Sequence, residues 1–126
     1  MKVNEAIAEA NELRLNTLDD TLKEAWLRSL DGQILEMMQL DEDAQEHEAG
    51  TWPDAGIWPE ADPDLLLPAP HDMVYVYHLI AQIDYRNQEI ALYTNDMAFY
   101  NAAMRDARAW WRRNHTPKYR GNWRVM

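Results

Sequence analysis

The stretch IALYTNDMAFYNAAMRDARAWW, residues 90–111, decides the fold of this chain. Its apolar residues recur three and four positions apart without a miss, which is the period of one face of an α-helix. These seam residues are Ile90, Tyr93, Met97, Tyr100, Met104, Ala107 and Trp111. At about 1.5 Å per residue the run would be about 33 Å long, with a seam suited to packing on another helix. The pattern therefore predicts a long C-terminal helix over about 88–114.

The preceding segment, MVYVYHLI at residues 73–80, is rich in strand-forming residues and could be taken for a β-strand. No turn residue follows until Asn87, however, and the apolar residues keep a 3-4-3 spacing that favours a helix. Apolar residues on its other faces predict a helix over 72–86 that is largely surrounded by protein, with Asp72 as N-cap. Asn87-Gln88 is the favoured break before the last helix; the alternative is one continuous helix.

Two more helices are predicted nearer the N-terminus. A stripe of apolar residues with glutamates off it predicts a helix over 2–14, and Thr17-Leu18-Asp19-Asp20 resembles a capping box that opens a helix over 18–39. The first stripe is Val3, Ile7, Ala10 and Leu13, and the second is Leu22, Trp26, Leu30, Ile34 and Met37. The fold class is therefore all-α: a single small domain of four helices.

The remaining segments lack helical periodicity. Residues 41–70 contain most of the prolines and many acids, which predicts a long loop, and residues 116–126 read as a tail. A structureless loop of this length in a small domain is either functional or ordered by a partner. Its expected anchors on the core are Trp52, Ile57, Trp58 and the run Leu65-Leu66-Leu67.

Charge is divided along the chain. Of the 12 Lys and Arg residues seven lie within residues 105–126, whereas 21 of the 22 acids lie outside it, and the net charge is −10. Such a molecule is suited to pairing its ends head-to-tail or to docking a different partner at each end. The overall negative charge argues against non-specific nucleic-acid binding by the chain as a whole.

The sequence contains no recognisable catalytic motif. The chain has no cysteine, a single serine at Ser29, four scattered histidines and no glycine arrangement that could cradle a phosphate. We therefore expect no enzymatic activity, no catalytic residues, no metal site and no cofactor. No stretch approaches the roughly 20 apolar residues of a membrane span, so no membrane association is expected.

The basic C-terminal region interleaves arginines with aromatic residues. This composition is typical of protein interfaces and also of nucleic-acid binding. We favour the protein interface because the rest of the chain supplies an acidic counterpart. A simpler alternative is that the arginines only complement the helix dipole. The predicted partner-binding residues are Arg105, Arg108, Trp110, Trp111, Arg112, Arg113, Lys118, Tyr119, Arg120, Trp123 and Arg124.

Residues 65–118 resemble the head–tail connector, or adaptor, proteins of long-tailed phages and prophages of Gram-positive bacteria. The residues that carry the resemblance are Pro68-Ala69-Pro70, Asp72, Tyr75, Tyr77, Leu79, Ala81-Gln82-Ile83-Asp84-Tyr85, Asn87, Glu89, Tyr93, Asn95, Met97, Phe99-Tyr100-Asn101 and His115-Thr116-Pro117-Lys118. Trp26-Leu27 and Leu30-Asp31-Gly32 add a weaker match. One departure is Gln88, where an Asn-Gly turn would have glycine.

The resemblance implies an all-helical structural subunit of the virion neck, made in the host cytoplasm. It would form a ring on the portal protein, twelve-fold in the virion and either assembled or monomeric in isolation. It would contact tail-proximal connector proteins and extend the exit channel, with DNA only as passing cargo. The acidic loop would then bind a partner or face the channel, through Asp41, Glu42, Asp43, Glu46, Glu48, Asp54, Glu60, Asp62 and Asp64. The alternatives are an acidic DNA-mimic inhibitor, another small phage-encoded protein-binding module, and a nucleic-acid binder acting through residues 105–126.

Overall fold

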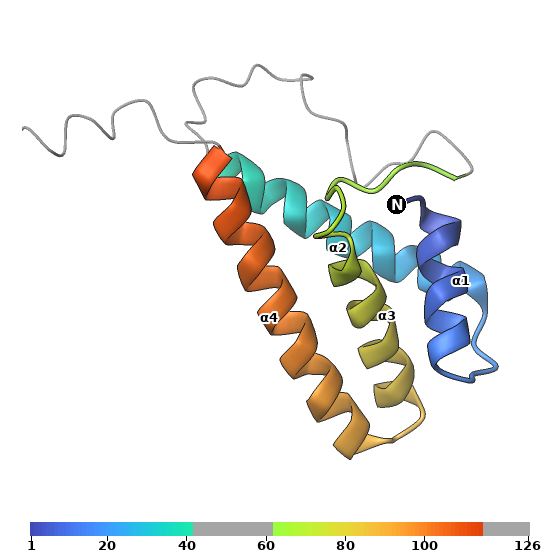
Figure 1. The fold of residues 1–126 in the computed structure, drawn as a ribbon. Helices are drawn as coiled ribbons and strands as arrows, with labels where there is room; N and C mark the ends of the chain where they lie inside the picture. The colour runs from blue at the N-terminus through green and yellow to red at the C-terminus, as the bar shows by residue number, and fades with distance from the viewer. Residues whose placement is uncertain (42–61, 115–126) are drawn as a thin grey trace, which may run out of the picture.

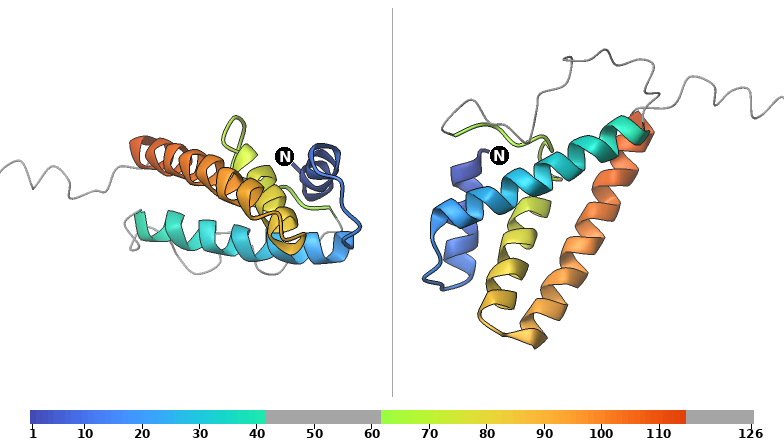
Figure 2. Two further views of the ribbon diagram at one scale, coloured as in Figure 1. Left: turned by 90° about the horizontal axis from the view of Figure 1, so that it is seen from below. Right: turned by 180° about the vertical axis from the view of Figure 1, so that it is seen from behind.

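The computed structural model describes residues 1–41 and 62–114, and it shows an all-α arrangement of four helices (Figure 1). They are α1 (Val3–Leu13), α2 (Asp20–Asp41), α3 (Met73–Arg86) and α4 (Ile90–Asn114). Helix α3 lies between α1 and α4 in one layer, and α2 crosses one face of this layer (Figure 2). The predicted fold class and all four helices are confirmed.

Helix α2 begins at Asp20, two residues later than predicted. The carboxylate of Asp19 accepts a hydrogen bond from the backbone N–H of Thr21 at 3.2 Å, so Asp19 performs the capping that the sequence assigned to Thr17. Asp72 occupies the N-cap position of α3 as predicted, but its side chain makes no cap hydrogen bond.

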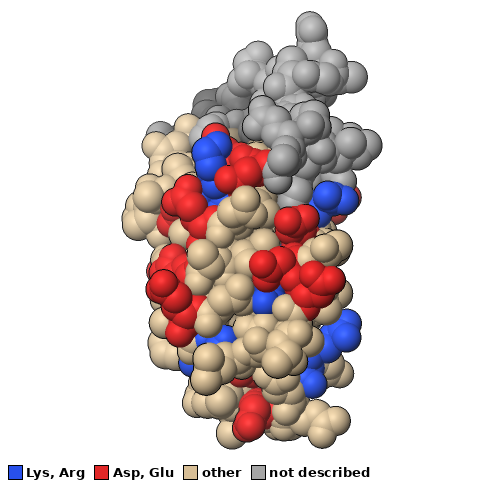
Figure 3. Space-filling view, turned by 90° about the vertical axis from the view of Figure 1, so that its right-hand side faces the viewer, with Lys and Arg blue, Asp and Glu red and all other residues tan. Residues whose placement is uncertain are grey.

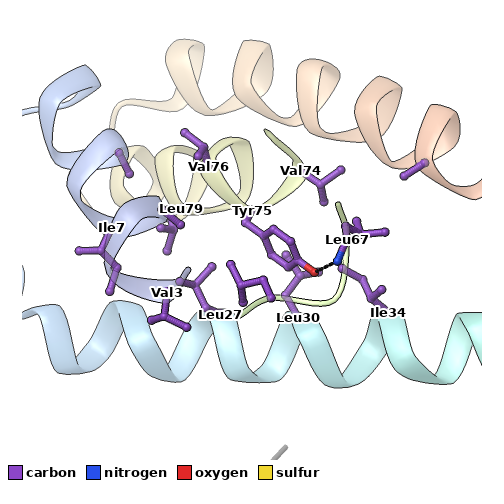
Figure 4. Close-up of a cluster of buried hydrophobic side chains, with 14 of the residues drawn as sticks. Val3, Ile7, Leu27, Leu30, Ile34, Leu67, Val74, Tyr75, Val76 and Leu79 are labelled. Carbon is purple, nitrogen blue, oxygen red and sulfur yellow. Dashed lines mark hydrogen bonds between the residues drawn. The ribbon is translucent and has the colours of Figure 1, made fainter. Parts of the chain in front are cut away.

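The core is built around α3, which is buried on several faces. Tyr75, Val76 and Leu79 are fully buried; Tyr75 and Leu79 point toward α2, whereas Val76 lies on the side of α3 away from α2 (Figure 4). The neighbours include Val3 and Ile7 of α1 and Leu27, Leu30 and Ile34 of α2. On α1 the predicted stripe holds up to Ala10, whereas Leu13, at the end of the helix, is half exposed. The prediction of a central helix surrounded by protein is confirmed.

A tight turn separates α3 from α4, so the two helices are not continuous. The N–H of Asn87 donates to Ile83 O at 3.0 Å, and the N–H of Glu89 donates to Asp84 O at 2.9 Å. Between them Gln88 has a φ of 62°, the left-handed conformation in which glycine is the least strained residue. The break predicted at Asn87-Gln88 is confirmed. Gln88 adopts the backbone conformation that glycine would have in an Asn-Gly turn.

The two helices then run antiparallel and are joined by aromatic pairs. Ring centroids lie 5.2 Å apart in Tyr85–Tyr93, 5.9 Å in Tyr77–Phe99 and 5.6 Å in His78–Tyr100. The seam of α4 is covered unevenly: Ala107 and Trp111 are buried, whereas Ile90 is 60% exposed. The helix is therefore packed tightly near its C-terminal end and leaves apolar surface at its start.

The segment that enters α3 is held on the N-terminal part of the chain. The N–H of Val3 donates to Pro63 O at 3.2 Å and that of Leu65 to Met1 O at 3.0 Å, which gives an antiparallel bridge between Lys2 and Asp64. Leu65 and Leu67 are buried, so this part of the predicted anchoring is confirmed. The other expected anchors, Trp52, Ile57 and Trp58, lie outside the described residues, as does most of the predicted loop.

Candidate functional site

The predicted basic region is divided by the structure into exposed arginines and a packed tryptophan pair. Arg105, Arg108, Arg112 and Arg113 are exposed along the last turns of α4, and we call these four residues the basic end. Trp111 is only 5% exposed and belongs to the hydrophobic core, because it continues the buried side of the helix one turn after Ala107. Its predicted place on a partner-binding surface is corrected accordingly.

Trp110 occupies an intermediate position at this end of the molecule. Its ring lies 5.0 Å from the ring of His71 and 6.2 Å from that of Trp111. Because it is half-buried, part of its ring remains accessible beside the basic end. The other predicted partner-binding residues of the tail lie outside the described residues; they are Lys118, Tyr119, Arg120, Trp123 and Arg124.

Two acids of the predicted loop are described in side-chain detail, and both contact the start of α1. The Asp62 carboxylate accepts a hydrogen bond from the N–H of Asn4 at 2.9 Å, and the Asp64 carboxylate lies 3.5 Å from the Lys2 ammonium group. Both acids are thus tied to the molecule's own N-terminal region, where they add to the negative charge of α1. Asp41 is the last residue of α2, and the remaining acids lie outside the described residues: Glu42, Asp43, Glu46, Glu48, Asp54 and Glu60.

A buried ion cluster joins three helices at the end of the molecule that holds the α3–α4 turn. Arg14, directly after α1, donates through Nε to Asp84 of α3 at 3.0 Å and through Nη2 to Asp96 of α4 at 3.3 Å. The two aspartates are 2% and 6% exposed. Burial and then the neighbouring Asp84 carboxylate raise the pKa of Asp96 to about 6, against the opposing effect of Arg14.

Paired carboxylates with a raised pKa are also found in catalytic acid–base sites. Here both acids are closed off from solvent and face the same guanidinium group. A substrate could not reach either carboxylate without separating α1 from the α3–α4 pair. The cluster therefore positions helices.

A second buried polar group fastens the chain before α3. The Tyr75 hydroxyl donates to Asp31 of α2 at 2.6 Å and accepts from the N–H of Leu67 at 3.0 Å, while the N–H of Leu66 donates to the same carboxylate at 3.3 Å. Burial raises the pKa of Asp31. These bonds satisfy backbone groups of the leucine run in the protein interior, which explains an aspartate in the apolar stripe of α2.

Lys23 is another charged residue that is buried. Its ammonium group donates to Asn11 Oδ1 at 2.6 Å, to Leu18 O at 3.2 Å and to Asp20 Oδ1 at 3.3 Å. It therefore ties α1 to the start of α2. Asp20 lies three residues earlier in the same helix, a spacing that brings side chains together. Asn11 and Leu18 are not identifiable from sequence periodicity, because these contacts depend on how the connection between the helices folds back.

The histidines within the described residues have packing contacts. His71 lies on Trp110, and burial lowers the pKa of His78, beside Tyr100, to about 4. In the described part of the chain, no group of three or more His, Cys, Asp or Glu residues could hold a metal ion. His47 and His115 lie outside the described residues.

Large apolar side chains are exposed at the same end as the ion cluster. On the α3–α4 pair they are Tyr85, Ile90, Leu92 and Phe99, and on the connection between α1 and α2 they are Leu13 and Leu15. Leu15 is 94% exposed. The two groups lie on opposite flanks of the domain, and exposed apolar side chains are found on surfaces that bind another protein. The sequence pattern included Ile90 in the seam of the last helix and Leu13 in the stripe of the first, whereas Tyr85, Leu15, Leu92 and Phe99 lie outside both.

No protein-family model matches this chain, and neither a curated protein nor a solved structure is significantly similar to it. Among the helices of residues 1–41 and 62–114, none combines the length and apolar character that crossing a bilayer requires.

Proposed function

We propose that this chain is a structural subunit of a phage head–tail connector, which assembles as a ring on the portal and extends the DNA exit channel, and that it is not an enzyme. The observation that carries the proposal is the resemblance of residues 65–118 to connector proteins. The residues that interrupt the helical pattern of this segment fall at the boundaries of α3: Pro68 and Pro70 precede the helix, and Asn87 ends it.

The surface of the described part supports an assembly role. Its exposed apolar side chains and the arginines of the basic end offer contact areas for other proteins, and its carboxylate pair is sealed behind Arg14. A subunit held between neighbours has use for such surfaces on several sides. In this proposal the portal protein and tail-proximal connector proteins are the partners, and the assembly lies in the virion neck.

The acidic stretch 41–64 has a proposed task in the channel. Carboxylates along the exit path would repel the phosphates of passing DNA, whereas Lys or Arg contacts would retain it. Conversion of these acids to lysine should then impair DNA passage or infectivity. Unimpaired particles would count against the channel-facing placement while leaving the connector role intact.

The decisive experiment is co-sedimentation of the purified full chain with purified portal rings. We expect the full chain to sediment with the rings and a variant ending at Asn114 to lose binding while keeping its helical circular dichroism. A matched control carries residues 115–126 in scrambled order, which preserves their charge and composition. Failure of the full chain to bind any portal ring, or a turnover activity of the isolated protein, would overturn the proposal.

A further inference from the structure

The outer face of α4 changes character along its length. From residue 90 to residue 104 the only charged residue is Asp96, and it is buried, so the exposed part of this half carries no charge. Ile90 and Phe99 are each 60% exposed, and the side that faces away from α3 carries the exposed small and polar residues Ala91, Thr94, Asn95, Ala98, Asn101 and Ala102. The basic end follows in the last turns. An uncharged helix face of this length is unusual on a chain in which 27% of residues are charged.

This face lies on the flank of the domain. In Figures 1 and 2 helix α4 is the outermost helix on one side of the three-helix layer, and it packs mainly on α3. Only Asp96, Ala107 and Trp111 of its 25 residues are buried. The side of α4 that faces away from α3 is therefore open to another molecule.

The opposite flank is formed by α1, and its outer face has the complementary order. Glu5 and Glu12 are exposed and Glu9 is half-buried, while Leu13 and Leu15 are exposed after them. Figure 3 shows carboxylates over this flank, with Lys and Arg side chains among them. Since α1 and α4 run in opposite directions, the acidic start of α1 and the basic end of α4 lie at the same end of the molecule (Figure 1).

We propose that the outer face of α4 docks on the outer face of α1 of a second copy of this chain, with both copies in the same orientation. The arginines of the basic end would then meet the glutamates of α1, and the apolar start of α4 would meet Leu13 and Leu15. One contact thus pairs the arginines with acids and the uncharged half of α4 with the exposed leucines of the second copy. The alanines of α4 and Ala8 of α1 allow the two helices to approach closely.

The competing self-contact, α4 against α4 about a two-fold axis, fits the surface less well. An antiparallel pairing of two identical α4 faces would set each basic end over the apolar start of its partner, where the arginines would find no acid. The contact between α4 and α1 is heterologous instead, and a heterologous contact that closes on itself generates a ring. The proposed contact between α4 and α1 rests on the proposed function only in that it would be the lateral contact of the connector ring.

Site-directed cross-linking tests the contact, because the chain contains no cysteine of its own. Ala8→Cys and Ala102→Cys each place one thiol on an exposed position of the two proposed faces, and Ser29→Cys places one on the exposed side of α2 as a control. The single-cysteine proteins are mixed in pairs and treated with a short bis-maleimide. Circular dichroism of each variant verifies that the helices are retained.

We expect the Ala8→Cys and Ala102→Cys proteins to form heterodimers in roughly tenfold or greater yield than either forms with the Ser29→Cys protein, because docking raises the effective concentration of the two thiols. A protein carrying both substitutions should form a ladder of oligomers. Yields equal to the control, or preferential Ala102→Cys homodimers, would overturn the proposal.

A charge exchange provides an independent test. Arg105→Glu should lower the yield of the Ala8–Ala102 cross-link several-fold, and Glu5→Arg in the other protein should restore it. Loss without restoration would show that the arginine acts in another way and would overturn the charge pairing. These measurements use the chain alone, so they can fail while portal binding succeeds, and portal binding can fail while they succeed.

Discussion

Helices α3 and α4 come from one contiguous stretch and pack on each other, yet they meet solvent differently. Eight of the 14 residues of α3 are buried, from Val74 to Asp84, whereas only three of the 25 residues of α4 are. Helix α3 contacts α1, α2 and α4, and α4 mainly contacts α3. A regular apolar period therefore identifies both as helices without telling how much of each is covered.

The difference has an energetic consequence. Substitutions on α3 should act on folding, since its side chains are enclosed by the other helices. Substitutions on the outer face of α4 should spare folding and act on association. The ion cluster and the turn at Gln88 lie where the two helices meet, and their substitutions should have intermediate or small effects.

The largest expected effect on stability distinguishes α3 from α4 directly. Leu79→Ala in α3 removes a fully buried side chain and should lower the free energy of unfolding by about 3 kcal/mol, because it leaves a cavity. Leu92→Ala on the exposed side of α4 is the matched substitution and should change it by less than about 0.5 kcal/mol. Denaturant unfolding followed by circular dichroism measures both. Equal losses would contradict the contrast between the helices.

The second effect concerns the attachment of α1 to the pair. Arg14→Met leaves Asp84 and Asp96 buried beside each other without their cation, and should cost about 2 kcal/mol at pH 7.5. The loss should shrink at pH 5, because protonation then removes the unpaired charge. Arg105→Met, at an exposed arginine of α4, is the control with little expected effect. An undiminished loss at pH 5 would argue against an electrostatic cause.

A smaller effect of opposite sign is expected at Asp96. Its pKa in the folded protein is about 6, above the ordinary 3.8, so its contribution to stability is complete below pH 4 and is lost as the pH rises through 6. Asp96→Asn mimics the protonated form and should raise the free energy of unfolding at pH 7.5 by about 1 kcal/mol. It should also flatten the dependence of stability on pH between 4 and 6.

Asp106→Asn, at an exposed position on the same helix, is the control for this pH profile. It should leave the slope unchanged. A profile of the Asp96→Asn protein that keeps the original slope would place the titrating group elsewhere.

The smallest expected effect lies in the turn between the helices. Gln88→Gly relieves the left-handed strain at φ 62° and should raise the melting temperature, with a gain of about 0.5 kcal/mol after the added freedom of the unfolded chain is subtracted. Asn87→Gly, at φ −83°, adds that freedom without relieving strain and should be neutral or destabilising. A gain at Asn87 equal to that at Gln88 would contradict the explanation by backbone strain.

Much of the fold follows from the sequence because helices are local structures. The periodicity predicted the C-terminal helix over 88–114, and α4 spans Ile90–Asn114. The absence of a turn residue before Asn87 correctly excluded a strand at 73–80. The start of α2 was missed by two residues because Asp19 and Thr17 are both good N-caps, and backbone geometry selects between them.

The candidate surfaces were predicted less completely. The sequence located the basic end, but it placed Trp111 on the same surface, since a tryptophan among arginines has the composition of an interface. It passed over Leu92 and Phe99, which lie off the apolar seam, and over Leu15. It assigned Leu13 to the apolar stripe of the first helix, whereas the structure leaves Leu13 half exposed. Exposure is a property of the packed molecule, and a local pattern cannot report it.

The sequence by itself determined four helices, the break after Arg86 and the division of charge, because each depends on residues that are near neighbours in the chain. Only the tertiary structure decided that Arg14 meets Asp84 and Asp96, residues 70 and 82 positions away, and that Lys23 is buried. It also decided that the acidic start of α1 lies at the same end as the basic end of α4. These features depend on how the helices pack in space, where groups far apart in the chain first come within reach of one another's charge.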